Sequence, residues 1–255
     1  MITDTHAHVT WESFDADREQ VFARAQAAGV SRIVLVGTNL ASSRAVFECA
    51  RDRAGVHPTA GIHPHDAQDA TPQVRAAIEE LCARPECVAV GETGLDWFKQ
   101  YAPREAQLES FRWQLRLARE LDKPVIVHCR AAHADVVALL REVPGVRGVM
   151  HCYTLGPAEL PEYLALGFSI SFSGVVTYAR NDDNRAAARA VPEERLLVET
   201  DCPFLAPQGR RGQRNEPAFV RETLAEIARL RGVELEPLAR ATSANAARLF
   251  GFAPP

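Results

Sequence analysis

Short apolar runs alternate along the chain with longer segments in which apolar and charged residues repeat at helical spacing. Eight runs predict β-strands: Ile2 to His8, Arg32 to Gly37, Thr59 to His63, Cys87 to Thr93, Pro124 to Cys129, Gly148 to Cys152, Phe168 to Ser173 and Leu196 to Asp201. The segments between them that predict helices include Asp15 to Ala28, Leu40 to Arg53, Thr71 to Ala83, Arg104 to Leu121 and Ala132 to Val143. In one of these, Phe111, Leu115 and Ala118 fall on one helical face, with charges between them. The pattern therefore predicts a repeated β–α unit.

The predicted strands are apolar on both faces, as in Ile33 to Val36 and Val125 to Val127. Such runs are typical of a parallel sheet covered by helices. Eight β–α repeats favour closure into a (β/α)8 TIM-type barrel. A doubly wound open sheet is the alternative, but its first strand is usually followed by a glycine-rich loop. Here a histidine pair stands at that place, and no linker interrupts the chain, so we expect residues 1–255 to form a single barrel domain.

Composition narrows the class of protein only modestly. The apolar fraction of 47% and the charged fraction of 24% are ordinary for a globular protein. A net charge of −4 gives no overall attraction to nucleic acid, so any such contact needs a local basic patch. No run approaches the ~18 apolar residues of a membrane span, and no signal-peptide pattern opens the chain. The six cysteines form no CxxC pair, which favours reduced thiols in a cytoplasmic protein.

Candidate metal ligands lie at the carboxyl ends of the predicted strands. His6 and His8 alternate along the first strand, so both rings lie on one face and can bind one ion. An HxH pair alone is a weak motif, and a lone strand-end histidine is more often structural than a ligand. Here the pair is accompanied by four further strand-end residues: Glu92, His128, His151 and Asp201. Burying so many ionisable groups without a metal or a partner would cost several kcal/mol each, so together they predict a metal site.

Six ligands are too many for one catalytic ion that keeps an open position, but they suit two ions about 3.5–4 Å apart. Imidazole and carboxylate ligands without cysteine argue against a structural zinc site. Glu92 is the natural bridging ligand, because its strand lies between the two groups of histidines. The first ion would take His6, His8, Glu92 and Asp201, and the second would take Glu92, His128 and His151. We therefore expect two divalent ions per chain, Mg, Mn or Zn.

The same residues carry a family resemblance. The motifs are Asp4-Thr5-His6-Ala7-His8, Gly61-Ile62-His63-Pro64-His65, Gly91-Glu92-Thr93-Gly94-Leu95-Asp96, His128-Cys129-Arg130, His151-Cys152-Tyr153 and Glu199-Thr200-Asp201-Cys202-Pro203-Phe204-Leu205. In this order they resemble the TatD family of metal-dependent hydrolases. The resemblance implies a TIM-type barrel with two divalent ions and DNase activity, often as a 3′-to-5′ exonuclease. It also implies the six ligands above, with His63 near the scissile phosphate. Tyr153-Thr154-Leu155-Gly156 departs from the family pattern in a loop that holds no ligand.

Further residues receive roles from their place beside the ligands. Asp201 is the expected catalytic base, since a ligating carboxylate has a second oxygen for the proton of a metal-activated water. Glu199 and Asp4 each lie two residues from a ligand on the same strand face, and we expect them to orient the site, with a second base as the alternative role of Glu199. Substrate contacts are predicted for His63, His65, Arg130, Arg210 and Arg211, although a surface loop or a salt bridge would also explain His65 and the arginines. Trp97, Phe98 and Tyr101 are placed to stack a base, whereas Trp11 and Trp113 are interpreted as packing.

Three functions fit these features. The preferred one is metal-dependent hydrolysis of DNA phosphodiester bonds by hydroxide attack, with Asp201, Glu92 and His63 as catalytic residues and single-stranded DNA or a DNA end as the substrate. The second, for which the resemblance leaves room, keeps the barrel and the ions but hydrolyses a carboxylic ester or amide, such as a D-aminoacyl-tRNA. The third is a metal-stabilised nucleic-acid binder without turnover. None requires a membrane or an obligate protein partner.

Overall fold

The computed structural model describes residues 1–253. Its internal packing divides the chain into two compact units. The first unit contains Met1–Leu35, Cys152–Leu164 and the chain from Ser169 onward; the second contains Val36–His151 and Ala165–Phe168. Residues 254 and 255, which belong to the expected single domain, lie outside the described residues. The expectation of one domain stays a prediction.

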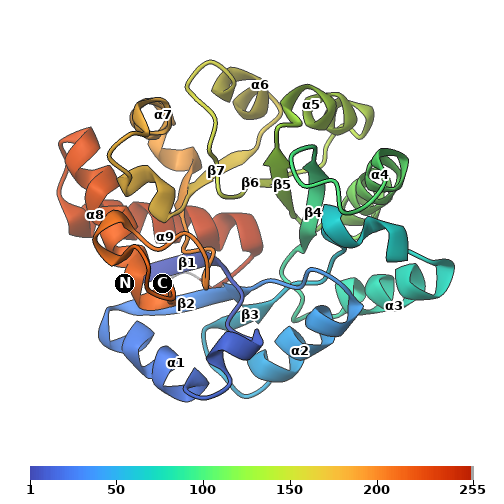
Figure 1. Ribbon diagram of the computed structural model, residues 1–255, viewed down its shortest axis with the longest axis horizontal. Helices are drawn as coiled ribbons and strands as arrows, with labels where there is room; N and C mark the ends of the chain where they lie inside the picture. Colours follow the sequence, from blue (N-terminus) through green and yellow to red (C-terminus); the bar gives the residue numbers. More distant parts are fainter. Residues whose placement is uncertain (254–255) are drawn as a thin grey trace. The chain divides into compact units, whose positions relative to one another are not determined.

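Strands and helices alternate in chain order, as the colours of Figure 1 show. The strands are β1 Ile2–Ala7, β2 Val30–Leu35, β3 Val56–Pro58, β4 Val90–Asp96, β5 Val125–Arg130, β6 Gly148–Met150, β7 Ser169–Phe172 and β8 Leu196–Val198. The α-helices are α1 Arg18–Ala27, α2 Leu40–Ala50, α3 Pro72–Ala83, α4 Arg104–Glu120, α5 His133–Glu142, α6 Leu160–Ala165, α7 Asp182–Ala190, α8 Val220–Arg231 and α9 Leu235–Phe250. No helix within residues 1–253 has both the length and the apolarity that crossing a membrane requires.

In the first unit, the first strand of the chain lies beside the segment that follows the last strand. β1 pairs with β2, β7 pairs with β8, and a parallel bridge joins Ala7 to Cys202 beyond β8. Helix α9 packs against both β1 and β8 (Figure 1). Its buried Asn245 donates to the carbonyl of Leu196 at 2.9 Å, which supports the start of β8. The carboxyl end of β1 and the segment that follows β8 therefore lie side by side.

In the second unit, β4, β5 and β6 form consecutive parallel pairs. Gly94 is opposite His128, and Val127 is opposite Met150. Helix α4 covers β4 with an apolar face that includes the fully buried Phe111 and Leu115. The carboxyl ends of these three strands consequently lie at one edge, where the sequence places Glu92, His128 and His151.

The observed strands differ from the predicted ones in their bounds, and two of the differences bear on the candidate site. The prediction of Thr59 to His63 is wrong as a strand, because the strand is β3 Val56–Pro58 and only an isolated bridge joins Ala60 to Val90. The buried Gln114 on α4 takes over the hydrogen bonds of Ile62, accepting from its N–H at 2.8 Å and donating to its carbonyl at 2.9 Å. A side chain thus satisfies backbone groups that a strand would otherwise pair.

Strand β4 runs Val90–Asp96, three residues further along than the predicted Cys87 to Thr93. Its glycines explain the shift, since glycine usually indicates a break in a strand. A Cβ at Gly94 would lie 2.0 Å from the carbonyl oxygen of His128, and one at Gly91 would lie 2.8 Å from that of Ile126. Both glycines are required for the close approach of β5, and the strand continues through them to Asp96.

Candidate metal centre and active site

In the first unit, two histidines and one carboxylate converge at the end of β1. The Nε2 atoms of His6 and His8 lie 3.1 Å apart, and Asp201 Oδ1 lies 3.6 Å from the first and 3.5 Å from the second. Both rings are buried, whereas the Asp201 side chain keeps 14% of its surface exposed. Two nitrogens at this separation would subtend an angle of about 95° at an ion bound at about 2.1 Å. The three side chains therefore have the spacing of ligands of one ion.

The backbone after β8 sets the position of Asp201. The N–H of Asp201 donates to the carbonyl of His6 at 2.9 Å, and the N–H of His8 donates to that of Cys202 at 2.9 Å. Between these bonds Asp201 adopts a left-handed conformation with φ of 56°. Non-glycine residues rarely adopt this left-handed conformation, and those that do cluster at functional sites. The bend carries the Asp201 carboxylate to the two imidazoles.

Asp4 connects β1 to the segment after β8 through hydrogen bonds. Its carboxylate accepts from the Thr200 N–H at 2.9 Å, from the Thr200 hydroxyl at 2.6 Å and from the His6 N–H at 3.3 Å. Burial, with a smaller contribution from the Glu199 carboxylate, raises the pKa of Asp4 to about 8. A positive charge nearby would stabilise this carboxylate, and a divalent ion would supply one.

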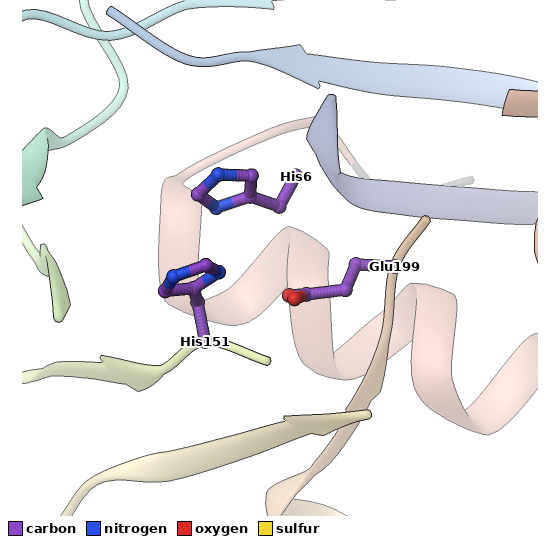
Figure 2. Close-up of side chains that lie close together, drawn as sticks. All are labelled: His6, His151 and Glu199. Carbon is purple, nitrogen blue, oxygen red and sulfur yellow. The ribbon is translucent and has the colours of Figure 1, made fainter. Parts of the chain in front are cut away.

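Glu199 lies beside these groups. Its buried carboxylate accepts from the N–H of Cys152 at 2.6 Å. Figure 2 shows the side chains of His6, from β1, and Glu199, after β8, extending into the same space. The orienting role predicted for Glu199 stays a prediction; in the structure Glu199 ties the segment after β6 to the segment after β8.

In the second unit, the carboxylate of Glu92 is surrounded by histidines. Glu92 Oε1 lies 2.9 Å from His151 Nε2, 3.1 Å from His128 Nδ1 and 3.4 Å from His63 Nε2. His151 Nε2 and His128 Nδ1 are 3.5 Å apart, and His151, also labelled in Figure 2, follows β6. Glu92 itself is 3% exposed. One carboxylate oxygen and two imidazole nitrogens thus form a second group with ligand spacing.

Asp96 is a candidate site residue that sequence reasoning missed. Its Oδ2 lies 3.2 Å from His128 Nε2 and 2.9 Å from His65 Nε2, while Oδ1 accepts from the N–H groups of Phe98 and Lys99 at 2.9 and 2.7 Å. Burial alone would raise the pKa of Asp96, but the hydrogen bonds from His128, Lys99 and His65 outweigh it and lower the pKa. The available signal was its position four residues after Glu92, on the same face of one strand.

Asp96 also defines the state of His128. Burial opposes the charged form of His128, but hydrogen bonds to Asp96 and Glu92 outweigh burial and raise its pKa. In the charged ring Nε2 donates to Asp96 and Nδ1 donates to Glu92; when the ring loses a proton and Nε2 keeps its bond to Asp96, the lone pair is on Nδ1. A carboxylate that fixes the tautomer of a metal-binding histidine is the usual arrangement around such a ligand.

His63 and His65 are adjacent at the start of a short helical turn, Pro64–Asp69. The Nδ1 of His63 accepts from the N–H of His65 at 3.1 Å, so the neutral ring carries its proton on Nε2. Burial lowers the pKa of His63 to about 4, which keeps the ring neutral at neutral pH. His63 therefore presents an N–H donor beside Glu92. His65, predicted to contact the substrate, lies against Asp96 and the ring of Tyr101.

The three arginines predicted to contact the substrate differ in the contacts that they make within the protein. Arg130 is exposed, and its guanidinium lies 4.1 Å from the ring centre of Phe98. Arg210 donates to Glu222 at 2.8 Å, whereas Arg211 lies 5.0 Å from the ring centre of Tyr178. These contacts leave Arg130 and Arg211 the stronger candidates for a phosphate.

The nearby aromatic residues divide in a similar way. Trp97 donates to Asp135 at 2.9 Å and lies beneath Arg104, so it packs within the second unit. Phe98 and Tyr101 are each 62% exposed. The suggestion that these aromatics stack a base is thus limited to the latter two.

The donor set fits divalent metal ions. His63, Glu92 and His128 offer ligand atoms that all lie within 4.8 Å of one another. In both units the donors are imidazole nitrogens and carboxylate oxygens, and all six cysteines are free thiols. Such mixed nitrogen and oxygen donors suit catalytic rather than structural metal sites.

Comparison with known proteins decides the family. The family model of TatD-related DNases matches residues 3–251. The chain belongs to the TatD family. The metal-dependent hydrolase YabD of Bacillus subtilis is 42% identical over 253 residues, which are 98% of this chain and 99% of the relative. The 3′-5′ ssDNA/RNA exonuclease TatD of Klebsiella pneumoniae is 40% identical over 258 residues, covering 98% of this chain and 97% of the relative.

The comparison also confirms the predicted fold class. The crystal structure of YJJV, a TatD homologue from Escherichia coli K12, matches with a TM-score of 0.92 and 29% identity over 98% of each chain. The fold is the (β/α)8 TIM-type barrel of the TatD family, as the β–α alternation predicted. Membership of this family makes the chain a metal-dependent hydrolase of the DNase type.

Proposed function

We propose that this TatD-family protein removes nucleotides from the 3′ end of DNA, using two divalent ions, Mg, Mn or Zn, to hydrolyse phosphodiester bonds. The convergence of buried imidazole and carboxylate donors in each unit carries the proposal. The named activity of the Klebsiella pneumoniae relative, on single-stranded DNA and RNA, supports this substrate class. A cytoplasmic location is part of the proposal, and the six free thiols favour it.

We assign the ligands by the two groups of donors. His6, His8 and Asp201 would hold one ion, and His128 and His151 the other, with Glu92 shared between them. When bound, such ions activate a water molecule and neutralise charge on the phosphate. Glu92 suits the shared position because its carboxylate faces several histidines within its own unit.

The chain's own residues supply proton transfer and orientation. Asp201 accepts the proton of the attacking water, since its partly exposed carboxylate is the ligand most open to solvent in the first unit. His63 donates a hydrogen bond from Nε2 to an oxygen of the scissile phosphate, because the His65 N–H occupies its Nδ1. Asp4 and Asp96 hold His6 and His128 in position. Arg130 and Arg211 bind flanking phosphates.

The test uses single-stranded DNA labelled at either the 5′ or the 3′ end, incubated with the protein and Mg²⁺ or Mn²⁺, with and without chelator. We expect the 3′ label to be released first, and release to stop with chelator. Glu92→Ala should lose bound metal and nearly all activity, whereas the exposed Glu80→Ala should keep both. Intact DNA alongside turnover of an aminoacyl ester would favour the esterase function. Tight DNA binding without turnover would favour a binding protein.

A further inference from the structure

Two exposed aromatic rings adjoin the ligands of the first unit. Trp11 and Phe204 are 37% and 45% exposed, although large apolar side chains are mostly buried within residues 1–253. Their ring centres lie 5.1 Å apart at an interplanar angle of 86°, an edge-to-face contact. The ring centre of Trp11 is also 5.3 Å from that of His8. The pair, called here the Trp11–Phe204 platform, is therefore continuous with the candidate metal site.

Matching backbone turns place both rings. Trp11 is three residues after His8, and its N–H donates to the His8 carbonyl at 3.1 Å. Phe204 is three residues after Asp201, and its N–H donates to the Asp201 carbonyl at 3.0 Å. Each ring is thus fixed one turn beyond a proposed metal ligand. The two turns come from segments far apart in the chain, yet they bring the rings into contact.

The turn that carries Phe204 is also stabilised by hydrogen bonds from a buried side chain. The fully buried Asn215 donates to the carbonyl of Thr200 at 2.8 Å and to that of Phe204 at 2.6 Å. One side chain therefore spans both ends of the segment that carries Asp201. A ring held in this way loses little conformational entropy when a ligand stacks on it.

We propose that the Trp11–Phe204 platform stacks an unpaired nucleobase of one of the two nucleotides that flank the scissile phosphate. The inference rests on the proposed function and deepens it. A base is joined through one sugar to the phosphate that enters the metal site, so it must lie close to the ligands. Stacking accepts any base and selects for single strands, because in a duplex the neighbouring pairs cover both faces of a base.

The size and place of the platform favour a base over a protein partner. Two rings offer far less than the ~800 Å² that each partner buries in a standard protein interface. The sequence interpretation of Trp11 as packing is incomplete, because the indole packs on His8 and keeps a surface open to solvent. Phe98 and Tyr101 are the competing exposed aromatic residues in the second unit.

The experiment measures KM and kcat on three single-stranded oligonucleotides. One carries every base, and the other two lack the base at the last or at the penultimate position of the 3′ end. For the wild type, we expect one of the two missing bases to raise KM about 10-fold, a factor within the range for loss of one base–aromatic stack. Trp11→Ala should raise KM by a similar factor on the complete oligonucleotide. On the oligonucleotide whose missing base raises the wild-type KM, Trp11→Ala should have no effect. Phe204→Leu should act in the same direction, and Trp11→Phe should retain most of the affinity.

The controls separate stacking from damage to the site. Trp113→Ala removes an aromatic ring on α4 that is paired with Glu79 and Arg75, and it should leave all three KM values unchanged. An equal loss for Trp11→Ala on all three oligonucleotides would mean that Trp11 only supports His8, and would overturn the platform. A base-dependent loss in Phe98→Ala alone would assign the base to the other pair. A wild type that leaves every oligonucleotide intact would overturn the proposed function as well.

Discussion

Asp96→Asn tests how the second unit prepares a histidine to bind metal. The Asp96 carboxylate accepts two backbone N–H groups on Oδ1 and faces the Nε2 atoms of His65 and His128 on Oδ2. Asparagine keeps the size of the side chain and can keep the two backbone bonds. Its NH₂ group would then face His128 Nε2, which would have to accept rather than donate. The proton would move to His128 Nδ1, the atom that faces Glu92, and a protonated nitrogen cannot bind metal.

The expected magnitude is the one typical of such outer-shell partners, a 10–100-fold loss of metal affinity, equivalent to about 1.4–2.7 kcal/mol. Only the ion that we assign to His128 should weaken. A competition titration with a fluorescent chelator measures the two affinities, and the rate of DNA hydrolysis as a function of Mn²⁺ concentration gives an independent value. At saturating Mn²⁺ most of the lost rate should return, because Asp96 does not contact the reacting atoms.

Asp135→Asn is the matched control, because this carboxylate pairs with Arg104 and Trp97 in the same unit but contacts no proposed ligand. His65→Ala removes the other imidazole on Asp96 and should change metal affinity less, since His128 keeps its acceptor. Equal metal affinities for Asp96→Asn and Asp135→Asn, in folded proteins, would refute the role of Asp96. So would a rate that Mn²⁺ does not restore.

Three further predictions concern the pH dependence, the basic loop and the backbone. The pKa of His63 falls from 6.5 to about 4 through burial, so between these values only the unfolded chain takes up the proton and stability rises with pH. Urea unfolding of the metal-free protein should show this gain, about 3 kcal/mol, and His63→Asn should lack it. Arg211→Ala should weaken single-stranded DNA binding and reduce the slope of log K against log salt concentration by about 0.7. Arg214→Ala is the control: it should leave this slope unchanged and lower the Tm, because its guanidinium donates to Asp17 and Ser13. Gly94→Ala should lower both Tm and metal content by more than Gly145→Ala does, since only at Gly94 would a new Cβ meet backbone, 2.0 Å from an oxygen of β5.

The periodicity of the strands was sufficient to predict the fold class and to select the strand-end residues that converge within each unit. Alternation along β1 places His6 and His8 on one face, and their Nε2 atoms are 3.1 Å apart. Parallel pairing of β4 with β5 brings Glu92 to His128 in the same way. These relations follow from local geometry that every strand shares, which is why a pattern of apolar runs can predict them.

The residues that the pattern missed depend on contacts from distant segments. Two buried glutamines of α4, Gln107 and Gln114, accept hydrogen bonds from the backbone of Asp96, at the end of β4, and of Ile62, in the segment predicted as a strand. Glutamine on a helix normally indicates a solvent-facing position. Nothing in its spacing shows that it replaces a sheet hydrogen bond. The contact of Trp11 with Phe204 could not be predicted for the same reason, since the two residues lie far apart in the sequence.

The two units differ in their proportions of imidazoles and carboxylates. In the first, two imidazoles accompany three carboxylates: His6, His8, Asp4, Glu199 and Asp201. In the second, four imidazoles accompany two carboxylates: His63, His65, His128, His151, Glu92 and Asp96. Asp4 and Asp96 are both fully buried, yet burial dominates at Asp4 and raises its pKa to about 8, whereas imidazole and backbone donors lower that of Asp96. The first unit thus offers its carboxylates fewer imidazole donors than the second, and added positive charge would stabilise them. A divalent ion bound there would stabilise the fold, so we expect the ligands at the end of β1 to couple metal binding to the joining of β1 with the segment after β8.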